Sequence, residues 1–267
     1  MKPTRTPPPV VVGIDGSPSA VRAAEWAVNE AASRDVPLRL VHVIQSTAAD
    51  VSHETDLAVV ALDDAQSAVR RKSEPVKVET AIVRGPVVAT LVAESRGATM
   101  ICLGSAGCQR QASRFIGNTG TAVSQSASCP VAVVRTLDGA PSATTGAVAV
   151  IVDEPTEVDA ILSVALAEAR LRHAPLLVLN VTSARIRELA PEEVDGDVAE
   201  WLGGHPEVPS RVVMVPDDVA TFIGDSVSPI ALAVVANGVA ASQVLGPYGR
   251  FVLRGSGCSV LMVPTHG

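Results

Sequence analysis

The chain has 267 residues, which is long enough for two domains that each bury their own core. Hydrophobic residues make up 47% of the sequence but aromatic residues only 2%, so the core must be built mainly from Ala, Val, Leu and Ile. The formal net charge of −7 argues against nucleic acid or an anionic membrane surface as the partner, since both attract a basic face.

The first half of the chain alternates expected strands and helices. Strands are expected at 10–15, 38–44, 77–83, 99–105 and 130–135, and helices at about 18–34, 55–72, 86–96 and from about 118. The first strand, VVVGID, is a continuous apolar run, as in a strand that is buried on both faces. Ser17 is the predicted N-cap of the first helix, and Pro18 is its predicted first residue.

The second half repeats the first. EAASRDVPLRLVHV at 30–43 matches EARLRHAPLLVLNV at 168–181, and the same constant offset aligns Asp15 with Asp153. The segment TLDGAPSATTG at 136–146 has the composition of a linker. We therefore expect a disordered tail at 1–9, a domain at 10–136, a linker at 137–146 and a second domain at 147–267.

The order of the elements predicts the fold class. Strands that alternate with helices predict two tandem doubly wound α/β domains, each with a five-stranded parallel sheet in the order 3-2-1-4-5. No apolar run is long enough to span a bilayer, and 1–9 lacks the apolar region of a signal peptide. The four cysteines form no CxxC pair and the five histidines have no metal-ligand spacing, which favours a reduced cytoplasmic protein without a metal held by its side chains.

Glycines mark a candidate binding loop in GSAGCQRQASRFIGNT at 104–119. Gly104 ends the fourth strand beside Asp15 at the end of the first, where the strand order reverses and ligands bind in such sheets. Gly117 precedes the helix from about 118, whose free N–H groups favour an anion. Because glycine lets the main chain approach phosphate closely, the spacing predicts a phosphate cradle. Glycine-rich turns of this kind also occur without a ligand, so a purely structural turn stays open.

Taken together, VVVGIDGSPSA, RLVHVI, the G-x2-G-x9-G spacing and SCPVAVVR resemble the universal stress protein family. The chain is similar to the tandem-domain members common in actinobacteria, over 9–135 and more faintly over 146–264. The resemblance implies a fold of the adenine nucleotide alpha hydrolase type with pseudo-two-fold symmetry. It also implies a cytoplasmic role in stress response, growth control and dormancy, and binding of ATP with Mg²⁺ on its phosphates.

The resemblance also implies roles for individual residues. Asp15 would hold the adenosine end, and the main chain of Val43 would read the adenine edge, while the three glycines would line the triphosphate. The family has Ser or Thr after the last glycine where this chain has Asn118, whose amide can still donate, so weakened or re-aimed binding is expected. The full expected set is Ile14, Asp15, Val43, Gly104, Gly107, Gly117, Asn118 and Thr119.

The second copy departs further from the pattern. It keeps Asp153 and Val181, but seven residues instead of nine separate Gly238 from Gly246, and Pro247 removes an N–H donor. We expect the second domain to bind no nucleotide and to serve a structural role.

Several alternatives remain open. The leading hypothesis is an ATP-binding regulatory protein with little or no turnover. A slow ATPase or nucleotidyl transferase is the second, although no HxGH-like motif is present. A non-binding interaction module is the third, which Asn118 keeps open. Asp15 itself suits a catalytic base less well than a ribose or adenine ligand or a turn-capping Asx residue.

The fifth strand of each copy is expected to form an apolar sheet edge, at Val131–Arg135 and at Ser259–Val263. An uncovered edge favours pairing. The tandem repeat and the family's dimers lead us to expect these two edges to pair antiparallel within one chain, and a homodimer stays open beside that pairing.

Overall fold

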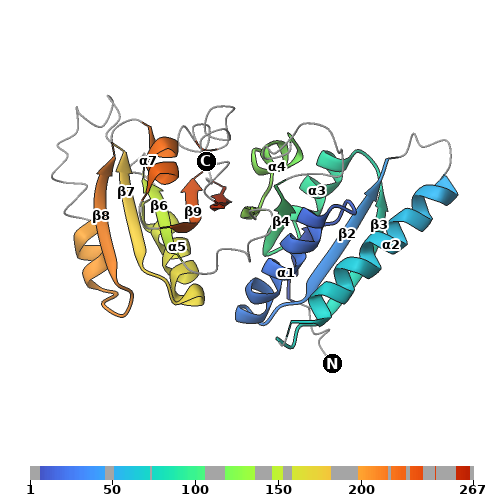
Figure 1. Cartoon of the computed structure of the whole chain (residues 1–267), viewed down its shortest axis with the longest axis horizontal. Coiled ribbons are helices and arrows are strands. Elements are labelled where there is room, and N and C mark those ends of the chain that lie inside the picture. The colour runs from blue at the N-terminus through green and yellow to red at the C-terminus, as the bar shows by residue number, and fades with distance from the viewer. Residues whose placement is uncertain are drawn as a thin grey trace. The chain divides into compact units, whose positions relative to one another are not determined.

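The structure is a computed structural model that describes residues 7–45, 51–72, 74–105, 118–135, 146–152, 158–181, 198–215, 218–226, 229–236, 244 and 257–264. The chain divides into two units, 1–135 (unit 1) and 136–267 (unit 2), and each is described by itself. In unit 1 the elements are β1 Val10–Gly13, α1 Pro18–Ser33, β2 Leu38–Ile44, α2 Val51–Arg70, β3 Val78–Arg84, α3 Val87–Ser95, β4 Met100–Gly104, α4 Asn118–Ser124 and β5 Val131–Val134 (Figure 1).

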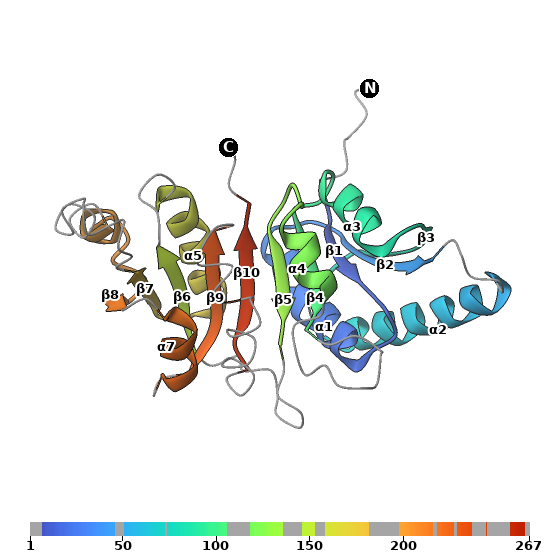
Figure 2. The same ribbon diagram turned by 90° about the horizontal axis from the view of Figure 1, so that it is seen from above.

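The sheet of unit 1 is parallel and has the order β3-β2-β1-β4-β5. Helices α1 and α2 pack on one face, and α3 and α4 on the other, so that α2 and α3 lie on opposite sides of the strands in Figure 2. The predicted parallel α/β fold class and strand order are therefore confirmed.

Helix α1 follows the sequence signals closely. The hydroxyl of Ser17 accepts a hydrogen bond from the N–H of Ala20 at 3.2 Å, and Pro18 is the first helical residue, as predicted. The buried face of α1 is mainly alanine, which lets the helix backbone lie close to the sheet without aromatic side chains. The predicted start of α2 at 55 was wrong by four residues. The polar first turn from Val51 lies outside the apolar pattern, although Glu54 suits the positive end of the helix dipole.

Unit 2 repeats this arrangement. Its elements are β6 Ala147–Val152, α5 Val158–Arg172, β7 Leu176–Val181, β8 Ser210–Val215, α7 Val219–Asp225, β9 Ile230–Ala236 and β10 Ser259–Val263. All its strand pairs are parallel, in the order β10-β9-β6-β7-β8. Val148 pairs with Leu176 as Val10 pairs with Leu38, so the offset that aligns the two copies in the sequence also holds in the strand register.

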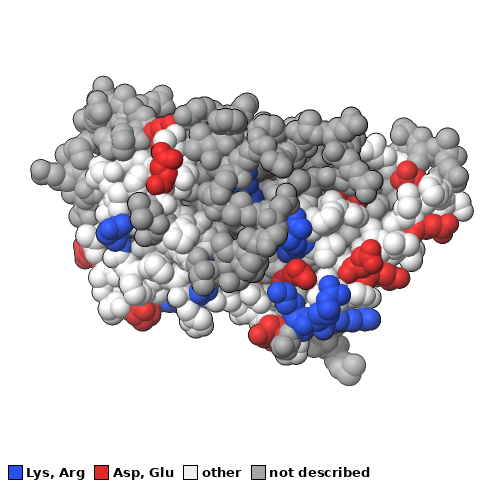
Figure 3. All heavy atoms as spheres, viewed as in Figure 1, with Lys and Arg blue, Asp and Glu red and all other residues white. Residues whose placement is uncertain are grey.

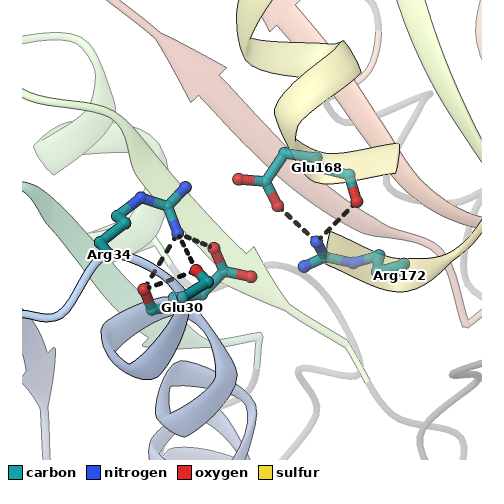
Figure 4. A network of polar contacts seen from close by, with 5 residues as sticks. Glu30, Arg34, Glu168 and Arg172 are labelled. Atoms are coloured by element: carbon teal, nitrogen blue, oxygen red, sulfur yellow. Dashed lines mark hydrogen bonds and ion pairs between the residues drawn. The ribbon is translucent and has the colours of Figure 1, made fainter. Parts of the chain in front are cut away.

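Each unit has an ion pair at the same position of its first helix (Figure 4). In α1, Arg34 Nη1 lies 2.6 Å from Glu30 Oε2, and in α5 Arg172 contacts Glu168 in the same way. Both glutamate side chains are fully buried, and each arginine also donates to the main-chain oxygen of its glutamate. Each pair thus neutralises a buried carboxylate and satisfies a carbonyl near the C-terminal end of a helix.

The core of each unit consists of its strands. Every residue of β5 and β7 is buried, and the large fully buried side chains are aliphatic apart from methionine. Charged side chains of both signs lie on the outside of the molecule (Figure 3). Among the helices that the structure describes, none combines the length and the hydropathy needed to cross a bilayer. The predicted pairing of the β5 and β10 edges stays a prediction.

Candidate functional site

The strand order of unit 1 reverses between β1 and β4. From β1 the chain moves outward through β2 to β3, and it then returns to the other side of β1 for β4 and β5. The crossovers therefore leave in opposite directions beyond the carboxyl ends of β1 and β4, which is where ligands bind in open α/β sheets. Gly13 ends β1 and Gly104 ends β4, so the predicted site residues Ile14, Asp15 and Gly104 all lie at this crevice.

The turn after β1 holds Asp15 in a defined position. Its Oδ1 accepts a hydrogen bond from the N–H of Ser17 at 3.0 Å, and Gly16 between them has a φ of 80°. This is an Asx turn that leads directly into α1, and its middle residue occupies the left-handed region that favours glycine. The turn-capping interpretation of Asp15 is thus confirmed. The residue is nevertheless exposed, at the carboxyl end of β1.

Gly104 is required by packing. A Cβ at this position would lie 2.6 Å from the main-chain carbon of Ser19 and 2.7 Å from its oxygen. Ser19 is buried, and its hydroxyl lies 2.9 Å from the hydroxyl of Ser17. The start of α1 therefore passes directly over the end of β4, and only glycine leaves room for it. Sequence reasoning explained this glycine by a phosphate cradle or by a glycine-rich turn and not by packing on Ser19, because that contact joins segments that are distant in the chain.

Val43 turns its main chain toward the crevice. The N–H of Ile14 donates to the carbonyl of Val41 at 2.8 Å, the last such bond from the β1 side to β2 among the described residues. Because strands have a two-residue period, Val43 directs its N–H and C=O to the same side as Val41. Beyond Ile14 the chain has turned away into α1, so these two groups face the space that β1 has left. The side chain of Ile14 itself is buried.

His42 of β2 is a further neighbour of the site, and no motif in the sequence indicates its position there. It is half-buried, and its Nδ1 is enclosed without a hydrogen-bond partner among the described residues. Burial lowers the pKa of the His42 imidazole, and the nearby carboxylates of Asp15 and Glu54 oppose that effect. This edge of the sheet thus brings one titratable ring near two acidic groups, one from the β1–α1 turn and one from the first turn of α2.

The segment predicted to bind phosphate, 104–119, is only partly described. Gly107 and Gly117 lie outside the described residues, as do Cys108, Arg110 and Arg114. Asn118 is the first residue of α4 and Thr119, half-buried, is the second. Because α4 returns from the carboxyl end of β4 toward the start of β5, its first turn belongs to the same edge of the sheet as Asp15 and Gly104 (Figure 1).

The equivalent edge of unit 2 is described in part. Val181 ends β7, whereas Asp153 and the residues of the degenerate glycine segment, Gly238, Gly246 and Pro247, lie outside the described residues. Over the described ranges of both units, no group of three or more His, Cys, Asp or Glu side chains is arranged to hold a metal ion.

Comparisons with known proteins agree on one family. The model of the universal stress protein family matches residues 8–135. Universal stress protein Rv2624c of Mycobacterium tuberculosis is 40% identical over 259 residues, which are 95% of this chain and 95% of that protein. Universal stress protein Rv3134c of the same organism is 36% identical over 264 residues, again 95% of both chains.

A solved structure extends the likeness to the fold of the whole chain. The crystal structure of a universal stress protein from Archaeoglobus fulgidus DSM 4304 matches with a TM-score of 0.71 and covers 96% of this chain and 98% of that one. Its sequence identity is 16%, so this match concerns the fold alone.

Proposed function

The chain belongs to the universal stress protein family, and we propose that it is a cytoplasmic regulatory protein of the stress response that binds ATP with Mg²⁺ in unit 1. The proposed site is the crevice beyond the carboxyl ends of β1 and β4. Turnover is expected to be slow or absent, because the sequence has no glycine-rich loop that ends in a Walker-type lysine. Unit 2 keeps the fold but not the glycine spacing, and we propose a structural role for it.

The main chain of Val43 is the observation that carries the proposal. An N–H and a C=O that face the same side of a strand form a donor and an acceptor side by side, and the adenine edge presents a ring-nitrogen acceptor beside an amino donor. Recognition of this kind needs no particular side chain. The carboxylate of Asp15, held at the same crevice by its turn, is an acceptor for a hydroxyl or amino group of the nucleoside.

The residues also fit a polyphosphate. The segment 104–119 offers main-chain N–H groups and the neutral side chains of Asn118 and Thr119, with no carboxylate among its residues. Neutral donors suit phosphate oxygens, whereas Mg²⁺ is typically held by the phosphates and water with few protein ligands. Gly104 keeps the end of β4 free of a side chain, and its approach to Ser19 fixes the start of α1 beside it.

The experiment that tests the proposal is calorimetric titration of the full chain with ATP and Mg²⁺. The parent protein should bind one nucleotide per chain. Val43→Pro removes the N–H on the side away from β3, so the strand pairing with β3 is kept, and affinity should fall at least tenfold, about 1.4 kcal/mol. Val43→Ala trims the side chain but keeps the N–H, and should bind within about threefold of the parent if the main chain is what recognises the base.

The repeat provides a matched control. Val181→Pro makes the same change at the equivalent strand position of unit 2 and should leave binding unchanged. Circular dichroism of each variant checks that the fold is retained. Absence of heat with the parent would favour a non-binding interaction module, and two sites per chain would contradict the structural role of unit 2. Phosphate release at a rate matching the nucleotide added would instead indicate an ATPase.

A further inference from the structure

Unit 2 contains a cavity along α7 that extends from the first residues of its strands to Val215, the last residue of β8. Its volume is about 1070 Å³, and it lies between α7 and the strands. The first residue of each of four strands lines it, namely Ala147, Leu176, Ser210 and Ile230. Ligand sites in proteins are typically clefts of about 300–1,000 Å³ with mainly apolar walls and a few polar groups, so the cavity is slightly larger than that range.

The repeat explains why the cavity exists. In unit 1 the same place holds an ion pair between β2 and α3, in which Arg39 Nε lies 3.0 Å from Glu94 Oε2 and Arg39 Nη2 lies 3.4 Å from Glu94 Oε1. The registers of β1 with β2 and of β6 with β7 make Leu177 the counterpart of Arg39. Helices α3 and α7 begin at Val87 and Val219, and counted from these first residues Ser226 takes the position of Glu94.

Unit 2 has thus lost the two long side chains that join strand to helix in unit 1. Leucine and serine replace them, and both line the cavity. The side of α7 that faces the cavity is also more apolar than the equivalent side of α3, because Phe222 takes the position of Thr90. Phe222 is one of three phenylalanines in the chain, and it lies half-exposed on the cavity wall. These three differences between the units therefore replace the polar contact of unit 1 with a cavity in unit 2 whose wall is largely apolar.

The lining of the cavity includes the cationic side chain of Arg211. Arg211 of β8 replaces Glu79 of unit 1, a reversal of charge, and it has no ion-pair or hydrogen-bond partner among the described residues. The carboxylate of Asp218 is already engaged, since its two oxygens accept from the N–H of Thr221 at 3.0 Å and from the Thr221 hydroxyl at 2.6 Å. The other acidic group of the lining, Asp225, is the last residue of α7.

We propose that this cavity binds a small amphipathic carboxylate, with its apolar body against Leu177 and Phe222 and its acidic group at Arg211. Burial of an alkyl chain is favourable because it removes apolar surface from water, and a charge-assisted hydrogen bond to a guanidinium fixes the direction of entry. The site is independent of the proposed nucleotide site, because the two lie in different units.

The test is titration of the full chain with dodecanoate below its micelle concentration, with dodecylamine and dodecanol as matched probes. Dodecanoate should bind saturably at one site per chain. Leu177→Arg combined with Ser226→Glu rebuilds the ion pair of unit 1 inside unit 2 and should abolish binding. Arg211→Ala should weaken dodecanoate at least tenfold and leave dodecanol unchanged. Arg84→Ala, which removes an arginine at the end of β3 in unit 1, should change neither.

Each possible result of these titrations either supports or overturns the proposal. Undiminished dodecanoate binding by the double variant would overturn the assignment of the site, as would absence of saturable binding by the parent. Preference for dodecylamine that Asp225→Asn removes would overturn the acidic class of ligand. Circular dichroism controls for folding, and if the double variant fails to fold, Leu177→Phe fills the cavity without a charge and should lower affinity in its place.

Discussion

Substitution of Gly104 by alanine would show what the glycine at the end of β4 is for. The added methyl group would lie 2.6 Å from the main-chain carbon of Ser19, and Cβ atoms do not approach backbone so closely. Relief requires α1 to shift away from β4, because the obstacle is main chain and cannot rotate aside. Forced overpacking of this kind costs about 1–3 kcal/mol, and a rigid obstacle favours the upper half of that range, about 2–3 kcal/mol.

The two tryptophans make the measurement selective. Trp26 lies in α1 and Trp201 in unit 2, so in a Trp201→Phe background the fluorescence of Trp26 follows the unfolding of unit 1 in urea. With an m-value of about 2 kcal/mol/M, a loss of about 2 kcal/mol lowers the midpoint by about 1 M. Gly97→Ala is the control, because nothing lies within 4 Å of its added methyl group, and its effect should stay within about 0.5 kcal/mol.

All unfolding measurements are made without nucleotide. If Gly104→Ala unfolds at the same urea concentration as the parent, the steric argument is refuted, and loss of ATP binding in the same variant would then assign this glycine to the ligand. If the midpoint falls as expected, the glycine is required by the fold whether or not a nucleotide binds.

Three further predictions concern single residues. Asp35 and His173 follow the first helix of each unit with a φ of 51°, so replacing either with glycine should stabilise its unit by about 0.5–1 kcal/mol, measured by the fluorescence of Trp26 or Trp201; a loss of stability would show that the native side chain compensates the strain. Because burial lowers the pKa of His42 in the folded state, the unfolded chain takes up its proton first as the pH falls below about 6.5, and folding stability decreases from there until the pH passes below the folded pKa. His42→Gln should therefore flatten the dependence of the urea midpoint on pH between 7 and 5, and an unchanged slope would contradict this. Burial raises the pKa of the Cys129 thiol to about 11, so a variant that keeps Cys129 as its single cysteine should react with a disulfide reagent at pH 8 only on unfolding, and rapid reaction of the native protein would be evidence of exposure.

Local signals were sufficient to predict the elements of unit 1. The cap at Ser17 and the alternation of apolar strands with alanine-rich helices are short-range patterns, and the structure places each element within a few residues of its prediction. Reversal of strand order then brings Asp15 and Gly104 to one edge, which follows from topology alone.

Long-range neighbours were beyond sequence reasoning. Arg39 and Glu94 are separated by 55 residues, and nothing in either segment indicates that one contacts the other. The contact of Ser19 with Gly104 and the proximity of Glu54 to His42 could not be predicted either, because each depends on how a helix packs on the sheet. The cavity of unit 2 becomes interpretable only through the register, because side chains that it lacks can be identified only from their counterparts in unit 1.

The shared strand register has a consequence for how the halves of a duplicated chain diverge. A parallel ladder is held by amide groups that every residue but proline supplies, so exchange of the side chains at either end of the strands leaves the ladder intact. One copy can then keep the binding residues at the carboxyl ends of its strands while the other copy gains a new site elsewhere on its sheet. Neither set of substitutions requires compensating substitutions in the other copy.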